Sequence, residues 1–223
     1  MPSPNNEKKI FFQIALLTWY KRNKRAYIWR TTKDPYSVLV AEMMLQQTNA
    51  GKVVPVYEAF LQKYPTISKL LMSDEQELIS LLKPIGLKYK VTRLKNLAKE
   101  IFEKFGGNVP STKEELLSLP GVGEYIANAV LCFSYSKKLP LVDVNVIRLY
   151  ERVFSIKSEK KRARDDKRYW EFSHVMLPEN YKKFNLALID FSAKICLNRN
   201  PICRKCPIMI ICDYSDQNNG KTD

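Results

Sequence analysis

The chain has 223 residues, with 37 Lys or Arg against 23 Asp or Glu, which gives a formal net charge of +14. Hydrophobic residues make up 45% of the sequence, a share that excludes a disordered chain and allows a buried core. The basic excess indicates a polyanionic partner, most often nucleic acid, although a solvated basic surface would have the same composition. Because no apolar run approaches the roughly 20 residues of a membrane span and the N-terminus has no apolar signal core, we expect a soluble, cytoplasmic protein.

Helical periodicity dominates the chain, and no segment shows a convincing period-two strand pattern, so the predicted fold is all-α. The first helix is predicted at residues 7–22, with an apolar face made of Ile10, Phe11, Ile14, Leu17 and Tyr20. Asp34 and Pro35 predict the N-cap and first position of a strongly apolar helix. That helix carries one acid, Glu42, which is either a solvated side chain or a carboxylate placed near a cavity.

Glycines and capping patterns predict where the following helices begin and end. Gly51 should end the second helix, and a third should cover roughly residues 53–64. The capping-box patterns at 73–76 and 111–114 predict helices that begin at about 74 and 112. The remaining long helices are expected at residues 89–105, 124–135, 144–154 and 181–196.

A tight turn, Leu119-Pro120-Gly121-Val122-Gly123, lies between two of these helices. Pro120 cannot continue the preceding helix, and the two glycines allow backbone conformations that a Cβ forbids. Because a turn at the start of a helix directs unpaired N–H groups outward, this one can hold a phosphate. The alternative is an ordinary corner between two helices.

Two features lie between the turn and the C-terminus. Asp143 is the expected N-cap of the helix at 144–154. The segment at residues 157–168, KSEKKRARDDKR, holds seven basic residues and three acids. We interpret this segment as a solvated loop or exposed helix, with a phosphate contact as the alternative.

Four of the five cysteines form a C-x6-C-x2-C-x5-C array near the C-terminus: Cys196, Cys203, Cys206 and Cys212. This crowding favours metal ligation over a disulfide framework. Four thiolates suit either structural zinc or a [4Fe–4S] cluster, and the presence of only one close pair favours iron–sulfur. Arg199 lies between the first two ligands, and Arg204 and Lys205 between the next two, where these cations can contact DNA phosphates.

The LPGVG turn, the acid 20 residues after Gly123 and the cysteine array together resemble the helix–hairpin–helix DNA glycosylases of the endonuclease III superfamily. The resemblance implies a two-lobed fold, with a helical barrel lobe at 31–138 and a [4Fe–4S] cluster lobe formed by 1–30 and 139–223. It also implies a monomer, associated with the nucleoid and not with a membrane, that binds double-stranded DNA with a mismatched or damaged base. A DNA phosphate would be bound, often with a monovalent cation such as Na⁺ or K⁺, by Leu119, Gly121, Val122 and Gly123.

The position two residues after the second hairpin glycine distinguishes the subfamilies. Bifunctional endonuclease III has a Schiff-base lysine there, whereas this chain has Tyr125, which removes the nucleophile of the lyase reaction. The segment VAEMMLQQT resembles both the thymine-DNA mismatch glycosylases of the Mig type and the MutY-type adenine glycosylases. QQT is common in the adenine enzymes, but FNLALIDFSAKIC resembles the mismatch thymine enzymes more closely. We expect residues 213–223 to be too few for the 8-oxoguanine-reading domain of MutY-type enzymes.

The resemblance therefore implies a monofunctional glycosylase that removes thymine and uracil mispaired with guanine. Asp143 would stabilise an oxocarbenium-like transition state and orient or deprotonate the attacking water. Glu42 would protonate or hydrogen-bond the departing base, and Tyr125 would shape the pocket. Gln47 would fill the gap left by the flipped base and Leu87 would act as a wedge; their alternatives are a surface glutamine and a half-buried leucine.

Three other functions remain open at this point. QQT supports an adenine-DNA glycosylase that acts on A opposite G or 8-oxoguanine. A DNA-binding module of the same fold could lack catalysis, although Asp143 argues against that interpretation. A zinc-binding structural protein would lack the broad absorption near ~400 nm that a thiolate-bound [4Fe–4S] centre gives.

Overall fold

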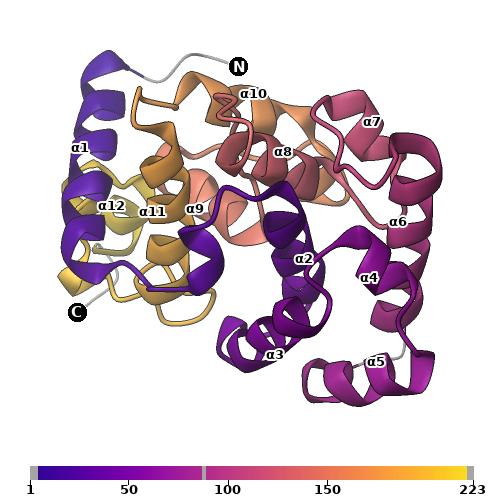
Figure 1. Ribbon diagram of the computed structural model, residues 1–223. Helices are drawn as coiled ribbons and strands as arrows, with labels where there is room; N and C mark the ends of the chain where they lie inside the picture. Colours follow the sequence, from indigo (N-terminus) through magenta and orange to yellow (C-terminus); the bar gives the residue numbers. More distant parts are fainter. Residues whose placement is uncertain (1–4, 87–88, 220–223) are drawn as a thin grey trace. The chain divides into compact units, whose positions relative to one another are not determined.

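The computed structural model describes residues 5–86 and 89–219. Within those two ranges all regular secondary structure is helical, which confirms the all-α prediction (Figure 1). No helix in the described part of the chain is long and apolar enough to cross a membrane.

The chain folds into two compact units. One unit combines Met1–Arg25 with Lys138–Asp223, and we call it the split unit. The other is the uninterrupted segment Ala26–Lys137, which we call the continuous unit. The sequence predicts lobes that divide after residues 30 and 138. The structural units divide after residues 25 and 137.

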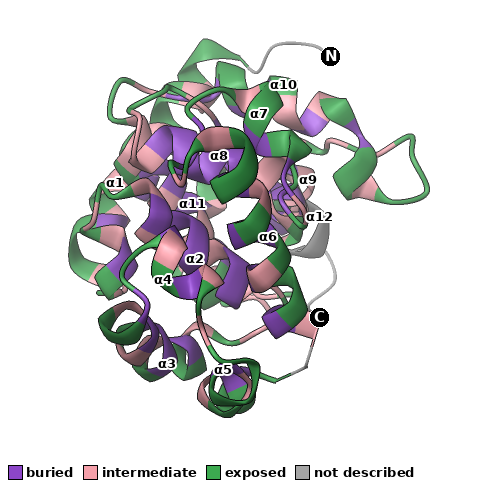
Figure 2. Cartoon of the chain, turned by 45° about the vertical axis from the view of Figure 1, so that its right-hand side comes forward, coloured by how far each residue is buried: buried purple, intermediate pink, exposed green. Residues whose placement is uncertain are grey.

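The continuous unit is centred on α2, which packs against α3, α6 and α8. Both α2 and α8 are apolar on nearly all sides, and such helices are stable only when they are buried. Figure 2 shows both of them largely buried. The helical elements of this unit are η1 (Ile28–Arg30), α2 (Pro35–Leu45), α3 (Ala50–Lys63), α4 (Ile67–Leu71), α5 (Glu75–Leu82), η2 (Lys83–Ile85), α6 (Tyr89–Phe105), α7 (Lys113–Ser118) and α8 (Glu124–Phe133).

The split unit has an aromatic core where α1 packs against α11 and α11 against α9. The Phe12 ring makes edge contacts with Phe154 and Phe184, at centroid distances of 5.1 and 6.2 Å. These contacts join the N-terminal helix to segments more than a hundred residues away in the sequence. The elements are α1 (Asn6–Asn23), α9 (Val144–Phe154), η3 (Ala163–Asp165), α10 (Lys167–Val175), α11 (Tyr181–Lys194), η4 (Cys203–Lys205), η5 (Met209–Ile211) and α12 (Asp213–Asn219).

The buried face of α1 differs from the prediction. Phe12, Leu16 and Tyr20 form it, with exposures of 0%, 0% and 8%. The predicted face is wrong for Ile10, Phe11 and Ile14, which are 45%, 37% and 60% exposed. Apolar residues lie on more than one side of this helix, so periodicity alone permits either face. The aromatic partners of Phe12 select the face that is buried.

The boundary predicted between the second and third helices is wrong, and the helices predicted at 124–135 and 181–196 end two residues earlier, at Phe133 and Lys194. Helix α2 ends at Leu45, before Gly51. Gly51 lies inside α3. The Asn49 side chain caps α3 by accepting the Gly51 N–H at 2.8 Å. The short QQT segment between Leu45 and Asn49 is therefore a loop and not a helical turn.

Helices α5 and α7 begin close to the predicted positions, but each is capped one residue later than the capping-box pattern indicated. Asp74 caps α5, where its Oδ1 accepts the Glu77 N–H at 2.9 Å. The Ser73 hydroxyl instead donates to the Leu70 carbonyl at 2.7 Å, which closes the end of α4. Thr112 caps α7 in the same way as Asp74 caps α5.

Candidate functional site

The turn from Leu119 to Gly123 buries its apolar side chains and exposes its glycines. Leu119 and Val122 are 3% and 7% exposed, whereas Gly121 and Gly123 are at the surface. The Val122 N–H donates to the Leu119 carbonyl at 3.2 Å. Gly121 has φ +79°, which with Pro120 before it gives a type II turn. The buried side chains thus fix the orientation of the exposed backbone.

The N-terminus of α8 begins directly after this turn. Gly123 is its N-cap, and no side chain among the described residues caps it. The first N–H groups of the helix therefore have no partner within the helix and point out of its end. A Cβ built at Gly123 meets no heavy atom within 4 Å, so the space beside this glycine is open. This geometry suits an anion such as a phosphate.

Helices α2 and α8 pack against each other and carry the two pocket side chains predicted in the continuous unit. Glu42 is half-buried on α2, between Ala41 and Met43, which are 1% and 3% exposed. Tyr125 is half-buried on the first turn of α8. A carboxyl group and a phenol on packed helices can both hydrogen-bond to a polar ligand. The pocket role of Glu42 stays a prediction.

The loop after α2 presents Gln47 at the surface with φ +56°, a conformation that a glutamine adopts only when its surroundings impose it. Lys90 supplies part of that constraint. Its ammonium group is buried, with the residue 3% exposed, and donates to the Met44 carbonyl at 2.7 Å and to the Thr48 hydroxyl. The Thr48 hydroxyl also donates to the Ile85 carbonyl at 3.3 Å.

Lys90 was not recognised as a site residue from the sequence. It precedes Leu94 and Leu97 on the apolar stripe of α6, and a lysine on such a stripe is a signal that could have been used. Burial lowers the pKa of Lys90, and the positive charge of Arg93 lowers it further. Leu87, the predicted wedge, lies outside the described residues.

Asp143 caps α9 in the split unit, as predicted from the sequence. Its Oδ1 accepts the N–H groups of Asn145 and Val146 at 2.9 and 2.8 Å, and its Oδ2 accepts the Asn145 side-chain amide at 2.9 Å. The three donors fix the orientation of the carboxylate, which remains partly exposed. Val144, next to it, is 60% exposed, so the surface around the acid is open to a ligand.

A chain of hydrogen bonds connects Asp143 to the cysteine loop. Asn145 Oδ1 accepts from Arg148 Nη1 at 2.9 Å. The same guanidinium donates to the Cys196 carbonyl from Nε at 3.1 Å and from Nη2 at 2.8 Å. The carboxylate and the first cysteine of the array thus share one rigid set of polar contacts. Asn145 and Arg148 were not recognised from the sequence.

The four cysteines of the C-terminal array line one cavity in the split unit, together with apolar side chains of α9 and α11. Burial raises the pKa of Cys206 to about 12, and burial also raises the pKa of Cys212. The neighbouring cysteines raise both values further. Thiolates would therefore need a cationic centre inside this cavity. In the described ranges no three His, Cys, Asp or Glu side chains are placed to hold a metal ion.

Two arginines frame the cysteine loop. Arg152 lies in the cavity wall, where its Nη1 is 3.5 Å from Cys196 Sγ and donates to the Leu197 carbonyl at 2.6 Å. Its guanidinium also lies over the Tyr214 ring, 4.8 Å from the centroid. Arg199, the predicted phosphate contact, is exposed on the loop between Cys196 and Cys203. Arg152 stabilises the loop from inside, whereas Arg199 is accessible to an external anion.

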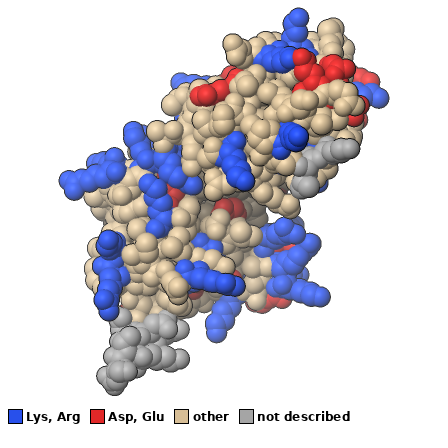
Figure 3. All heavy atoms as spheres, turned by 90° about the horizontal axis from the view of Figure 1, so that it is seen from below, with Lys and Arg blue, Asp and Glu red and all other residues tan. Residues whose placement is uncertain are grey.

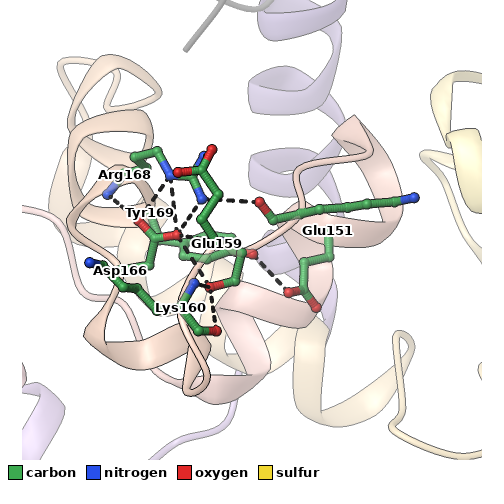
Figure 4. A network of polar contacts seen from close by, with 8 residues as sticks. Glu151, Glu159, Lys160, Asp166, Arg168 and Tyr169 are labelled. Carbon is green, nitrogen blue, oxygen red and sulfur yellow. Dashed lines mark hydrogen bonds and ion pairs between the residues drawn. The ribbon is translucent and has the colours of Figure 1, made fainter.

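Lys and Arg side chains are scattered over the face drawn in Figure 3, while Asp and Glu gather mainly at one end of it. The basic segment at 157–168 is mostly exposed, in agreement with its interpretation as a solvated segment. It folds around a buried acid, Asp166, which accepts hydrogen bonds from Arg168, the Ser158 hydroxyl and the Glu159 N–H (Figure 4). The hydrogen bond from Arg168 holds the pKa of Asp166 well below its usual range.

Comparison with protein families gives one match over most of the chain. The model described as "HhH-GPD superfamily base excision DNA repair protein" matches residues 40–172. A thymine-DNA glycosylase of Aeropyrum pernix is 40% identical over 204 residues, which cover 89% of this chain and 92% of that protein. A thymine/uracil-DNA glycosylase of Methanothermobacter thermautotrophicus is 36% identical over 219 residues, which cover 97% of this chain and 99% of that protein. An adenine DNA glycosylase of Buchnera aphidicola is 33% identical, covering 91% of this chain and 58% of its own.

Solved structures agree with these relatives. A thermostable thymine-DNA glycosylase superposes with a TM-score of 0.90 at 36% identity, covering 95% of this chain and 98% of its own. Endonuclease III in a non-covalent DNA complex superposes with a TM-score of 0.82, and the match covers 97% of this chain and 99% of that chain. Because its sequence identity is 21%, the second match shows the fold alone.

Proposed function

Because the chain belongs to the HhH-GPD superfamily of base excision DNA repair proteins, we propose that it is a DNA glycosylase that removes thymine and uracil mispaired with guanine. The observation that carries this proposal is the near full-length similarity, at 36–40% identity, to thymine and thymine/uracil-DNA glycosylases. The reaction is hydrolysis of the N-glycosidic bond, and the partner is double-stranded DNA bound by a monomer. A cytoplasmic location beside the chromosome stays a prediction.

DNA binding is assigned first to the turn before α8. Leu119 and Val122 anchor it, and the backbone at Gly121 and Gly123 meets a DNA phosphate together with a bridging Na⁺ or K⁺. The open space beside Gly123 supports this assignment, since a phosphate must approach the backbone closely. Arg199 adds a second phosphate contact from the split unit.

Base removal is assigned to two carboxyl groups. Asp143 stabilises the positive charge that develops on the sugar and orients or deprotonates the attacking water. Its three fixed hydrogen bonds support the assignment, because a preorganised carboxylate needs no rearrangement as that charge develops. Glu42 protonates or hydrogen-bonds the departing base, and Tyr125 contacts the base or sugar.

The target base must leave the helical stack, and a mismatched base costs less to extrude than a paired one. Gln47 takes the place of the flipped base in this proposal, and Leu87 is the wedge. The left-handed conformation of Gln47 supports this role, because Lys90 and Thr48 fix the loop that presents it. Those contacts make the loop a preformed element.

We assign a [4Fe–4S] cluster to Cys196, Cys203, Cys206 and Cys212. The four cysteines line one cavity, and their spacing, with only one close C-x2-C pair, favours iron–sulfur over a structural zinc ion. The positively charged core of such a cluster would stabilise these buried thiols as thiolates. Its chemistry here is structural, since it would cross-link the loop that carries Arg199.

An adenine-DNA glycosylase remains the second candidate, because the QQT segment is common in those enzymes. The adenine enzyme of Buchnera aphidicola is less similar and longer, with 58% of its length matched. A catalytically inactive DNA-binding module, the alternative of another class, is not favoured, because the relatives that match nearly the whole chain are DNA glycosylases.

One panel of duplexes tests these candidates. Labelled strands carry T opposite G, U opposite G, A opposite G or A opposite 8-oxoguanine, and single-turnover products are analysed with and without hot alkali. We expect excision of T and U, with strand breaks only after alkali. Excision of A alone would establish the adenine enzyme, and binding without excision would establish the inactive module.

A further inference from the structure

An arginine that the proposed function does not use lies against the turn at Leu119–Gly123. Arg93 is on α6, and its Cδ lies 3.6 Å from the position that a Cβ on Gly121 would occupy. The residue is exposed, and so is Gly121. Its cationic side chain therefore lies beside the backbone to which we assign a DNA phosphate.

Two further contacts hold this guanidinium in place. Nη1 donates to Gln46 Oε1 at 3.0 Å, while Gln46 Nε2 donates to the Gly121 carbonyl at 3.1 Å. The guanidinium carbon also lies 4.5 Å from the centroid of the Tyr89 ring, which is on the same helix. An exposed arginine is usually mobile, and the contacts with Gln46 and Tyr89 remove part of the entropy that Arg93 would lose on binding.

The positive charge of Arg93 is not neutralised by a carboxylate in the described parts of the chain. Other arginines of the protein are: Arg168 pairs with Asp166, and Arg162 pairs with Asp165. One of the five N–H donors of Arg93 is used by Gln46, so the others can reach a ligand. The buried Lys90 nearby adds a second positive charge to the same region.

We propose that Arg93 is a phosphate-binding residue, which contacts the DNA backbone beside the phosphate held by the turn, with Gln46 and Tyr89 as positioning residues. The proposal rests on the DNA-binding role of the turn and adds a side-chain contact beside it, separate from the contact assigned to Arg199. A guanidinium suits this task because its planar fork can bind two phosphate oxygens at once. Gln46 bonds both to Arg93 and to the turn, so the two phosphate contacts have a fixed spacing.

The test measures how duplex binding by the full-length protein depends on salt. The probes are a duplex with a G·T mismatch, whose thymidine carries a 2′-fluorine that blocks excision, and the same duplex fully paired. Arg93→Gln should reduce the slope of log K against log salt by about 0.9, the value for one phosphate. Affinity should fall about tenfold on both duplexes, because a phosphate contact carries no base information.

A second variant of Arg93 separates charge from geometry, and a variant at another arginine controls for net charge. Arg93→Lys should keep the slope and lose part of the affinity, since lysine retains the charge without the planar fork. Arg22→Gln is the matched control, because Arg22 is an exposed arginine on the last turn of α1. That variant should bind both duplexes as the wild type does. The thermal unfolding temperature of every variant should match that of the wild type, because Arg93 and Arg22 are both exposed.

The outcomes distinguish this proposal from the one it rests on. If Arg93→Gln keeps the wild-type slope and affinity while the wild type binds and excises, Arg93 does not contact a phosphate. If the wild type itself binds DNA with almost no salt dependence, the assigned DNA-binding role of the turn fails first. An equal loss of slope in Arg22→Gln would mean that the effect comes from net charge and would overturn the Arg93 contact.

Discussion

Asp143 is held by three donors, and this geometry predicts how an isosteric amide should behave. An asparagine at this position can still cap α9 through Oδ1, since Asn is as good an N-cap as Asp. It carries no negative charge to meet the cationic sugar. Asp143→Asn should therefore retain duplex binding and lose about 10²–10³ in the single-turnover rate of base excision. Excision at nearly the wild-type rate would reduce Asp143 to a helix cap.

In the proposed function, Tyr125 determines which product is formed. Schiff-base formation requires an amine, which a phenol does not provide. The wild type should leave an intact strand with an abasic site, and borohydride should trap no covalent complex. Tyr125→Lys should gain lyase activity and become trappable, with Tyr125→Phe as the control that stays untrappable. Trapping of the wild type would contradict the monofunctional assignment and direct attention to another lysine.

The helical elements follow from sequence where a local signal is unambiguous. Residues 89–105 and 144–154 were predicted with the bounds that the structure has, because strong amphipathic patterns run between clear caps and breaks. The face of α1 was not predictable, since the choice between Phe11 and Phe12 depends on rings contributed by α9 and α11.

The contacts that tie the candidate site together are also long-range. Gln46 and Gly121 are 75 residues apart, and Arg148 and Cys196 are 48 apart. Motifs in the sequence identified Gly121 and Cys196, whereas Gln46 was noted only as part of the QQT segment and Arg148 was not identified as a site residue. A polar side chain that bonds to a distant backbone carbonyl has no local pattern, because any backbone carbonyl can accept its hydrogen bond.

The loop that carries the cysteine array should depend on its bound group. Cys203→Ala or Cys206→Ala should remove a ligand, release the cluster and lower the thermal stability of the split unit, since metal binding and folding are coupled. Iron content and absorption near ~400 nm measure the first effect, and thermal unfolding the second. Cys132→Ala, in α8 of the continuous unit, is the control and should retain iron. A Cys203→Ala protein with normal stability and excision would refute the structural role.

The segment around Asp166 should respond to acid. Its folded pKa is depressed, so the stabilisation is complete above the pKa of an unfolded aspartate, about 3.9, and is lost as pH falls through the folded value. Unfolding of the wild type should therefore become easier below about pH 4. Asp166→Asn should be less stable at neutral pH and show a weaker loss on acidification. Denaturant unfolding at a series of pH values measures both, and identical pH profiles would contradict the assignment.

At the scale of the whole molecule, the charge of +14 should dominate the approach to DNA. Each phosphate that Lys or Arg neutralises releases counterions, so log K should fall linearly with log salt, with a slope near ~0.9 per phosphate. Counterion release depends little on the DNA sequence. Plots of log K against log salt for paired and mismatched duplexes should therefore have similar slopes and different intercepts. The rate of excision at saturating DNA should change much less with salt, because Asp143 is held by fixed hydrogen bonds within the protein. Titrations of both duplexes at several salt concentrations, with single-turnover rates at saturation, measure the two quantities separately. An affinity that hardly changes between low and moderate salt would mean that the basic surface does not face DNA.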